Sequence, residues 1–128
     1  MLNHYAQVLI TLADRKARAG EESFPYFEKA FQKYNVARNL EGLLQLGNTL
    51  QSLNDLVLHS KESRQLLGLA CKCYDEVIRL DDLNGEALSR YGDLLVKLAR
   101  RQTSETHYKR AGTLLRKAKL LHMLTQDS

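Results

Sequence analysis

Residues 70–77 read ACKCYDEV, with a small, a large and again a small side chain at the first, fifth and eighth positions. The same spacing occurs in residues 30–37, AFQKYNVA, and in residues 111–118, AGTLLRKA, at offsets of 40 and 41 residues. Steps of four and three residues place the three side chains on one face of a helix. The pattern therefore predicts three related helices, each able to hold a neighbouring helix close against its small residues.

A second motif precedes each of these helices. Residues 43–50 (LLQLGNTL) and 88–95 (LSRYGDLL) carry large side chains at the first, fourth and eighth positions and glycine at the fifth. Residues 5–12 (YAQVLITL) form a weaker copy without the glycine. Each motif pairs with the helix that follows it. The chain is therefore predicted to form three helical hairpins, at about residues 2–38, 40–81 and 85–124.

Capping and turn residues indicate where the helices end. Ser23 stands before a Phe-Pro pair, and proline is tolerated in a first helical turn because its missing N–H would lack a partner there. Ser60 or Ser63 is expected to cap the fourth helix, at about residues 62–81. Short turns are expected near residues 38–39 and 82–84. We expect six helices, at about residues 2–18, 24–38, 40–57, 62–81, 85–101 and 104–124.

Composition agrees with a single helical domain. The 128 residues are 44% hydrophobic and 27% charged, with one proline, and the formal net charge is +4. No stretch near twenty residues is apolar, and residues 1–13 lack a basic leader and a cleavage site, so neither a membrane span nor a secretory signal is expected. Two cysteines give no disulfide framework, which indicates a reducing compartment and a cytoplasmic location.

The combined pattern resembles the tetratricopeptide repeat (TPR), whose signature is W-x2-L-G-x2-Y, then A-x3-F, then P. Leu46-Gly47 and Tyr91-Gly92 match its L-G step, and the three small–large–small triads match its second helix. The resemblance covers nearly the whole chain. It implies an all-α fold, a right-handed α-solenoid of three antiparallel helical hairpins in a single TPR-like domain over residues 1–128.

The repeats are longer than those of the family. Gly47 and Ala70 are 23 residues apart, and Gly92 and Ala111 are 19 apart, although a whole consensus repeat has about 34 residues. The extra residues add roughly a turn to each helix or lengthen the connecting loop. A similar lengthening is seen in the plant-type receptor of the mitochondrial outer-membrane import machinery, a TPR-like family that carries a membrane anchor. HEAT and armadillo repeats share the 40-residue period but lack the Ala-x3-Tyr-x2-Ala step.

The resemblance also implies a concave groove, lined by the first helix of each hairpin, that holds a peptide or helix of a partner protein. The groove residues that it implies are Glu41, Leu44, Asn48, Glu86, Ser89, Arg90, Asp93 and Lys97. Chaperone-binding members of the family grip a terminal carboxylate with Lys, Asn and Arg. Asn48 and Arg90 fit such a set, but Leu44 and Glu86 stand where basic residues are needed, so no carboxylate grip is expected.

Residue types with catalytic or metal-binding chemistry form no recognisable site. Cys71 and Cys73 would lie about 200° apart on a helix, and no second pair of ligands is near, so we interpret them as small buried hydrophobes. The four histidines are scattered, and no Gly-rich phosphate loop exists. We therefore expect no enzyme activity, no cofactor and no metal.

Positive charge is concentrated in the last hairpin. Between Lys97 and Lys119 lie eight Lys and Arg residues and one acid, Glu105. The simplest interpretation is a solvated face, which terminal repeats need for solubility. The alternative is an electrostatic patch for an acidic protein, an anionic membrane or a nucleic acid. Nucleic acid is the weakest of these, because aromatic residues are not interleaved with the charges.

The end of the last helix is expected to carry a second apolar face. With Ala111 at 0° and 100° per residue, Leu120, Met123 and Leu124 fall at about 180°, 120° and 220°, away from the face that packs on the preceding helix. A homodimer or larger assembly through residues 117–124 is one way to cover them.

The leading functional hypothesis is a non-enzymatic adaptor that binds another protein in its groove. One alternative is a structural module that self-associates within a larger assembly. Another is an import-receptor-like binder of amphipathic targeting helices, for which Leu44 and an apolar groove would matter most; association with an organelle surface is compatible with it.

Overall fold

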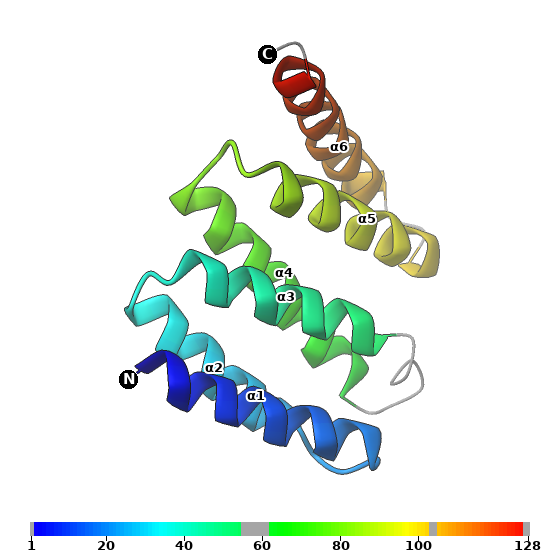
Figure 1. The fold of residues 1–128 in the computed structure, drawn as a ribbon. Coiled ribbons are helices and arrows are strands. Elements are labelled where there is room, and N and C mark those ends of the chain that lie inside the picture. The colour runs from blue at the N-terminus through cyan, green and yellow to red at the C-terminus, as the bar shows by residue number, and fades with distance from the viewer. Residues whose placement is uncertain (1, 55–61, 103–104, 127–128) are drawn as a thin grey trace. The chain divides into compact units, whose positions relative to one another are not determined.

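The computed structural model describes residues 2–54, 62–102 and 105–126, and this part of the chain is all-α (Figure 1). No strand occurs in these ranges, so the predicted all-α class is confirmed. The predicted extension of the third helix to residue 57 lies outside the described residues. The helices are α1 (Leu2–Arg18), α2 (Phe24–Val36), α3 (Leu40–Asn54), α4 (Ser63–Leu80), α5 (Gly85–Gln102) and α6 (Glu105–Gln126).

The chain divides into two compact units. The first is Met1–Glu76 and contains α1, α2, α3 and most of α4. The second is Val77–Ser128 and contains the end of α4 together with α5 and α6. In the first unit α1 packs on α2, and both contact α3; in the second, α5 packs on α6.

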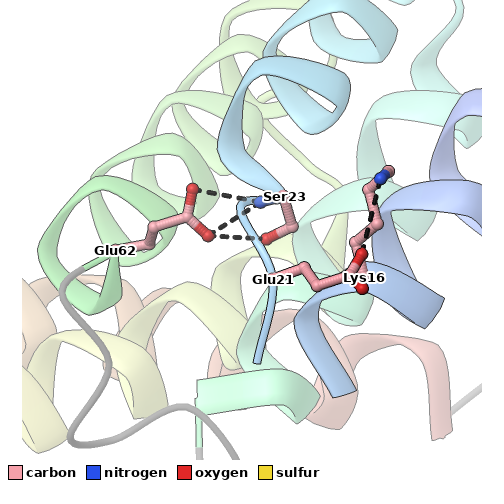
Figure 2. A network of polar contacts seen from close by, with 4 residues as sticks. All are labelled: Lys16, Glu21, Ser23 and Glu62. Atoms are coloured by element: carbon pink, nitrogen blue, oxygen red, sulfur yellow. Dashed lines mark hydrogen bonds and ion pairs between the residues drawn. The ribbon is translucent and has the colours of Figure 1, made fainter. Parts of the chain in front are cut away.

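Two cations of the first unit lie over aromatic rings at opposite ends of α1. Lys33 Nζ lies 5.6 Å from the centre of the Tyr5 ring, and Lys16 Nζ lies 5.2 Å from the centre of the Tyr26 ring. Lys16 also pairs with Glu21 at 3.5 Å across the connection between the helices (Figure 2). The start of α1 therefore meets the end of α2, and the end of α1 meets the start of α2.

The small–large–small triads are buried to different degrees. All three side chains of the 70–77 triad are enclosed. In the first triad Ala30 and Tyr34 are buried, but Ala37 is the C-cap of α2 and is exposed, so the prediction that it continues the packed face is wrong. The third triad is fully buried only at its first position. The triad pattern therefore predicts burial at all three positions only in residues 70–77, which belong to α4.

The glycines of the two full motifs lie beneath the large residue of the following triad. A Cβ added to Gly47 would lie 3.1 Å from the Tyr74 ring, and one added to Gly92 would lie 2.6 Å from Leu115 Cγ. A side chain at Gly92 would collide with Leu115, and one at Gly47 would make a contact with Tyr74 that is tighter than usual. The interpretation of both glycines as close-packing positions is therefore confirmed.

Asparagine side chains begin α3 and α5 in the same way. Asn39 Oδ1 accepts the N–H of Gly42 at 3.0 Å, and Asn84 Oδ1 accepts the N–H of Ala87 at 2.9 Å, which in each case is the third residue of the helix. The turns lie where the sequence predicts them. Gly42 also has the Tyr34 ring directly over its Cα, a close approach that the sequence motifs did not indicate.

The start of α2 is capped by a residue distant in the sequence. Glu62, just before α4, accepts the backbone N–H of Ser23 at 2.9 and 3.1 Å and the N–H of Phe24 at 2.9 Å, and its Oε1 accepts the Ser23 hydroxyl at 3.0 Å (Figure 2). A carboxylate is favoured at this position because the free N–H groups of a helix start carry partial positive charge. Glu62 thereby joins two helices that are 38 residues apart in the chain.

This contact corrects the expected caps. Ser23 precedes α2 as predicted, but its side chain bonds to Glu62 and makes no cap bond to its own helix. Ser63 lies inside the first turn of α4, because the carbonyl of Glu62 accepts the first helical hydrogen bond, from Leu66 N–H. The other expected cap, Ser60, lies outside the described residues.

Candidate functional site

Three of the groove residues implied by the resemblance lie on α3 in the first unit. Glu41 is exposed and Leu44 is half-buried. Asn48 is also half-buried, but it is not free to meet a ligand, since its side-chain oxygen lies 2.8 Å from the Tyr74 hydroxyl. Asn48 therefore contributes to the contact between α3 and α4.

The Tyr74 hydroxyl joins two amide side chains of α3. Its oxygen lies 2.8 Å from Asn48 Oδ1 and 2.9 Å from Gln51 Oε1. One hydroxyl proton serves only one acceptor, so one of the two amides must be turned to donate its N–H to the hydroxyl oxygen. The Tyr74 ring is buried against Gly47 while its hydroxyl is satisfied by polar side chains, which fixes α4 against α3 at one register.

The other implied groove residues lie on α5 in the second unit. Arg90, Asp93 and Lys97 are exposed, and Ser89 is half-buried. Arg90 Nε lies 3.2 Å from Glu86 Oε1 one turn earlier, so the two charges offset one another at the surface. This pairing leaves the start of α5 without the cluster of unopposed cations that a carboxylate grip needs.

A cavity of about 560 Å³ opens in the second unit, between the start of α5 and the second half of α6. Ser89, predicted as a groove residue, lines it together with Glu86, whereas Arg90, Asp93 and Lys97 do not. The lining residues are Leu83, Gly85, Glu86, Ser89, Leu115, Ala118, Lys119, Leu121 and His122. The cavity has the size of ordinary ligand sites, roughly 300–1,000 Å³, and combines apolar walls with a few polar groups.

Sequence reasoning missed the role of α6 in this cavity. The third triad was predicted to pack on the preceding helix, and Leu115 does lie over Gly92 of α5. Leu115 and Ala118 are nevertheless half-exposed and line the cavity together with Leu121. One signal for this role is the length of α6. At 22 residues it is the longest of the described helices, and it continues beyond the triad at residues 111–118 to the residues that line the cavity.

Two apolar surfaces lie outside any packed face. Tyr5, Val8 and Leu12 of α1 are between 41% and 51% exposed, although the residues at the same three positions of the 43–50 motif in α3 are fully buried. At the other end of the chain, the three apolar residues predicted to face away from α5 are between 54% and 63% exposed.

The residue types that bind metal ions do not gather in the described part of the chain. Within residues 2–54, 62–102 and 105–126, no group of three or more His, Cys, Asp or Glu side chains could hold a metal ion. Burial, and then the neighbouring Cys71 thiol, raises the pKa of Cys73 far above its usual range, so Cys73 is an inert core residue. Cys71 is half-exposed, which corrects the expectation that both cysteines are buried.

Comparison with known proteins adds no relative. No protein-family model matches this chain, and no curated protein or solved structure matches it. The likeness to the tetratricopeptide repeat therefore rests on the repeated motifs and on the glycine contacts of Gly47 and Gly92. In the part of the chain that the structure describes, no helix is both long and apolar enough to cross a bilayer.

Proposed function

We propose that this chain is a TPR-like protein-interaction module, a right-handed α-solenoid of antiparallel hairpins without enzyme activity. Two contacts support the repeat: Gly47 under Tyr74 and Gly92 under Leu115 occupy equivalent motif positions. The crossed pairing of the ends of α1 and α2 supports an antiparallel first hairpin. As a proposal, the module acts in the cytoplasm as an adaptor.

The observation that carries the proposal is the cavity between α5 and α6. Its apolar lining, made by Leu83, Leu115 and Leu121, suits the apolar face of a partner helix. Ser89 at its α5 side offers a hydroxyl to polar groups at the edge of such a helix. We propose an amphipathic helix as the ligand, since helices of this kind dock with their apolar face in a hydrophobic groove.

A grip on a terminal carboxylate is disfavoured by the same contacts. The amide of Asn48 is engaged with Tyr74, and the guanidinium of Arg90 is engaged with Glu86. Releasing either group would cost a hydrogen bond before any ligand is bound. The adaptor proposed here therefore recognises an apolar helix face and not a chain terminus.

The test is binding of a labelled amphipathic helical peptide, followed by fluorescence anisotropy, against a scrambled peptide of equal composition. Ala118→Trp fills the cavity and should weaken binding at least tenfold. Thr113→Trp, on the exposed opposite side of α6, is the matched control and should leave binding unchanged. Equal affinity of the two peptides, or equal effects of the two variants, would reject the cavity as the binding site.

A second candidate function, self-association within a larger assembly, is favoured by the exposed stripe on α1. In a solenoid the equivalent stripe of the next hairpin is buried, so the stripe on α1 is a natural place for a further helix. Val8→Lys with Leu12→Lys should then reduce the mass measured by light scattering after size exclusion. Gln7→Lys with Thr11→Lys, at exposed polar positions of the same helix, should not. A monomer in every case would exclude this candidate.

A further inference from the structure

The outer face of α6 combines two features, positive charge and exposed apolar side chains. At 100° per residue, the side of α6 opposite Ala111 is an arc of about 120°. Its first part is cationic and its last part is apolar. The arc also holds the exposed Thr113, and we call its cationic and apolar members the outer face of α6: Lys109, Arg116, Lys117, Leu120, Met123 and Leu124.

Burial separates this face from the packed side of the same helix. Ala111 and Leu114, which pack toward α5, are buried. Five of the six outer-face residues are exposed and the sixth, Lys117, is half-buried. The three apolar side chains of the outer face expose more than half of their surface.

The charge of the outer face is of one sign. No Asp or Glu occurs between Glu105 and Asp127. Glu86 of α5 lines the cavity together with α6 and pairs with Arg90. Glu105, the first residue of α6, precedes the cations of the outer face, and no acid follows it in residues 106–126, so the outer face attracts anions.

We propose that the outer face of α6 binds the surface of an anionic lipid bilayer. Lys109, Arg116 and Lys117 meet the headgroups, and the apolar triad at the end of the helix enters the boundary between headgroups and acyl chains. Membrane-surface helices require both elements, because each cation near an anionic leaflet adds a modest attraction and buried apolar area adds the rest. The face is part of a peripheral contact, since the opposite side of α6 stays packed on α5.

Charge argues against the other occupants of this face. A second copy packed face to face would bring three cations of each chain toward one another, which is unfavourable. A soluble acidic peptide satisfies the cations but leaves the half-exposed Leu120, Met123 and Leu124 without an apolar partner. A bilayer with anionic headgroups satisfies both parts at once.

Co-sedimentation with vesicles tests the proposal. Vesicles of phosphatidylcholine alone are compared with vesicles that contain roughly one third phosphatidylserine, at low and at high salt. We expect binding to the anionic vesicles only, weakened by salt. Arg116→Gln with Lys117→Gln should weaken it roughly tenfold to thirtyfold. Leu120→Ser with Leu124→Ser should weaken it to a similar degree.

Matched controls separate the outer face from net charge and from folding. Lys29→Gln with Lys72→Gln removes the same charge at exposed positions of the first unit and should leave binding nearly unchanged. Circular dichroism should be the same for all variants. Failure to bind anionic vesicles, equal binding to neutral ones, or equal losses in the control would overturn the proposal. So would a dimer formed through Leu120 and Leu124 without vesicle binding, or binding of soluble polyglutamate in place of vesicles.

Discussion

Helices α1 and α3 carry large apolar or aromatic residues at the same spacing, yet these residues meet different surroundings. On α3 the large residues Leu43, Leu46 and Leu50 are fully enclosed. On α1 the corresponding stripe is about half exposed. The difference in burial does not come from the spacing, because in both stripes the large residues stand at the first, fourth and eighth positions. Besides α1 and α2, α3 is contacted by α4, whose Tyr74 packs on Gly47, whereas the stripe of α1 has no comparable cover in the described part of the chain.

This difference shows what a repeat motif does and does not determine. Spacing places large residues on one helical face, but burial needs a second element to cover that face. In α3 the cover is partly supplied by Tyr34 of α2, which lies over Gly42. We therefore interpret the exposed apolar stripe of α1 as a surface that can bind a further element, and not as a defect of packing.

A pair of truncations tests the difference directly. Leu46→Ala removes a fully buried side chain and should lower the free energy of unfolding by about 2–5 kcal/mol. Val8→Ala, at the equivalent position of α1, should cost under about 1 kcal/mol because the side chain is half exposed. Urea denaturation followed by circular dichroism measures both. Equal losses would mean that the α1 stripe is covered in solution.

Glycine substitutions extend the comparison to the contact between paired helices. Gly92→Leu would place a side chain against Leu115 and should cost about 1–3 kcal/mol, offset slightly by the better helix propensity of leucine. Gly112→Leu is the control, because no atom lies within 4 Å of an added Cβ there. We expect a clear fall in Tm for Gly92→Leu and little change, or a rise, for Gly112→Leu. Similar effects at both positions would show that the hairpin register is wrong.

The cap on α2 should have an effect of intermediate size. Glu62→Gln puts an amide N–H₂ where two backbone N–H groups now meet a carboxylate, and we expect a loss of about 1–2 kcal/mol. Glu22→Gln, an exposed carboxylate next to Ser23, removes the same charge and should change little. Thermal unfolding of both variants measures the difference. A Glu62→Gln protein as stable as the parent would mean that water replaces the cap.

Much of the fold could be predicted from the sequence because it depends on local pattern. The spacing of the triads and motifs predicted six helices and an all-α class, and the structure confirms them for the described residues. The packing roles of Gly47 and Gly92 were also predictable, since both stand at the same position of a repeated motif. The contact of Glu62 with Ser23 was not, because nothing local links residues 39 positions apart.

The candidate site was harder to predict. The implied groove residues include Asn48, which is engaged with Tyr74, and Arg90, which is engaged with Glu86. Side-chain partners depend on the register between helices, and a one-turn error moves a residue from a groove into a contact. The cavity depends on how far Leu121 and its neighbours stand from α5, a tertiary distance that no spacing encodes.

The Tyr74 hydroxyl allows a finer test of the contact between α3 and α4. Tyr74→Phe keeps the buried ring against Gly47 but leaves the half-buried amides of Asn48 and Gln51 without the hydroxyl. We expect a loss of about 1 kcal/mol, the usual size for one such hydrogen bond. Tyr5→Phe, on the exposed stripe, should be neutral. If the two variants lose the same stability, the hydroxyl contributes nothing to the register of these helices.

The smallest expected effect concerns Cys71 and Cys73, two residues apart on α4 but differently buried. Burial raises the pKa of Cys73 above the ordinary value of 9.0, so the folded state keeps this proton while the unfolded state releases it. Below pH 9 both states are protonated and Cys73 does not change stability with pH. Above pH 9 the unfolded state is favoured, and the free energy of unfolding should fall by about 0.8 kcal/mol at pH 9.5. Urea denaturation at pH 7.5 and 9.5 should show this extra loss in the parent and in Cys71→Ala, but not in Cys73→Ala. An identical pH dependence in all three proteins would mean that the Cys73 thiol ionises as easily in the folded chain as in the unfolded one.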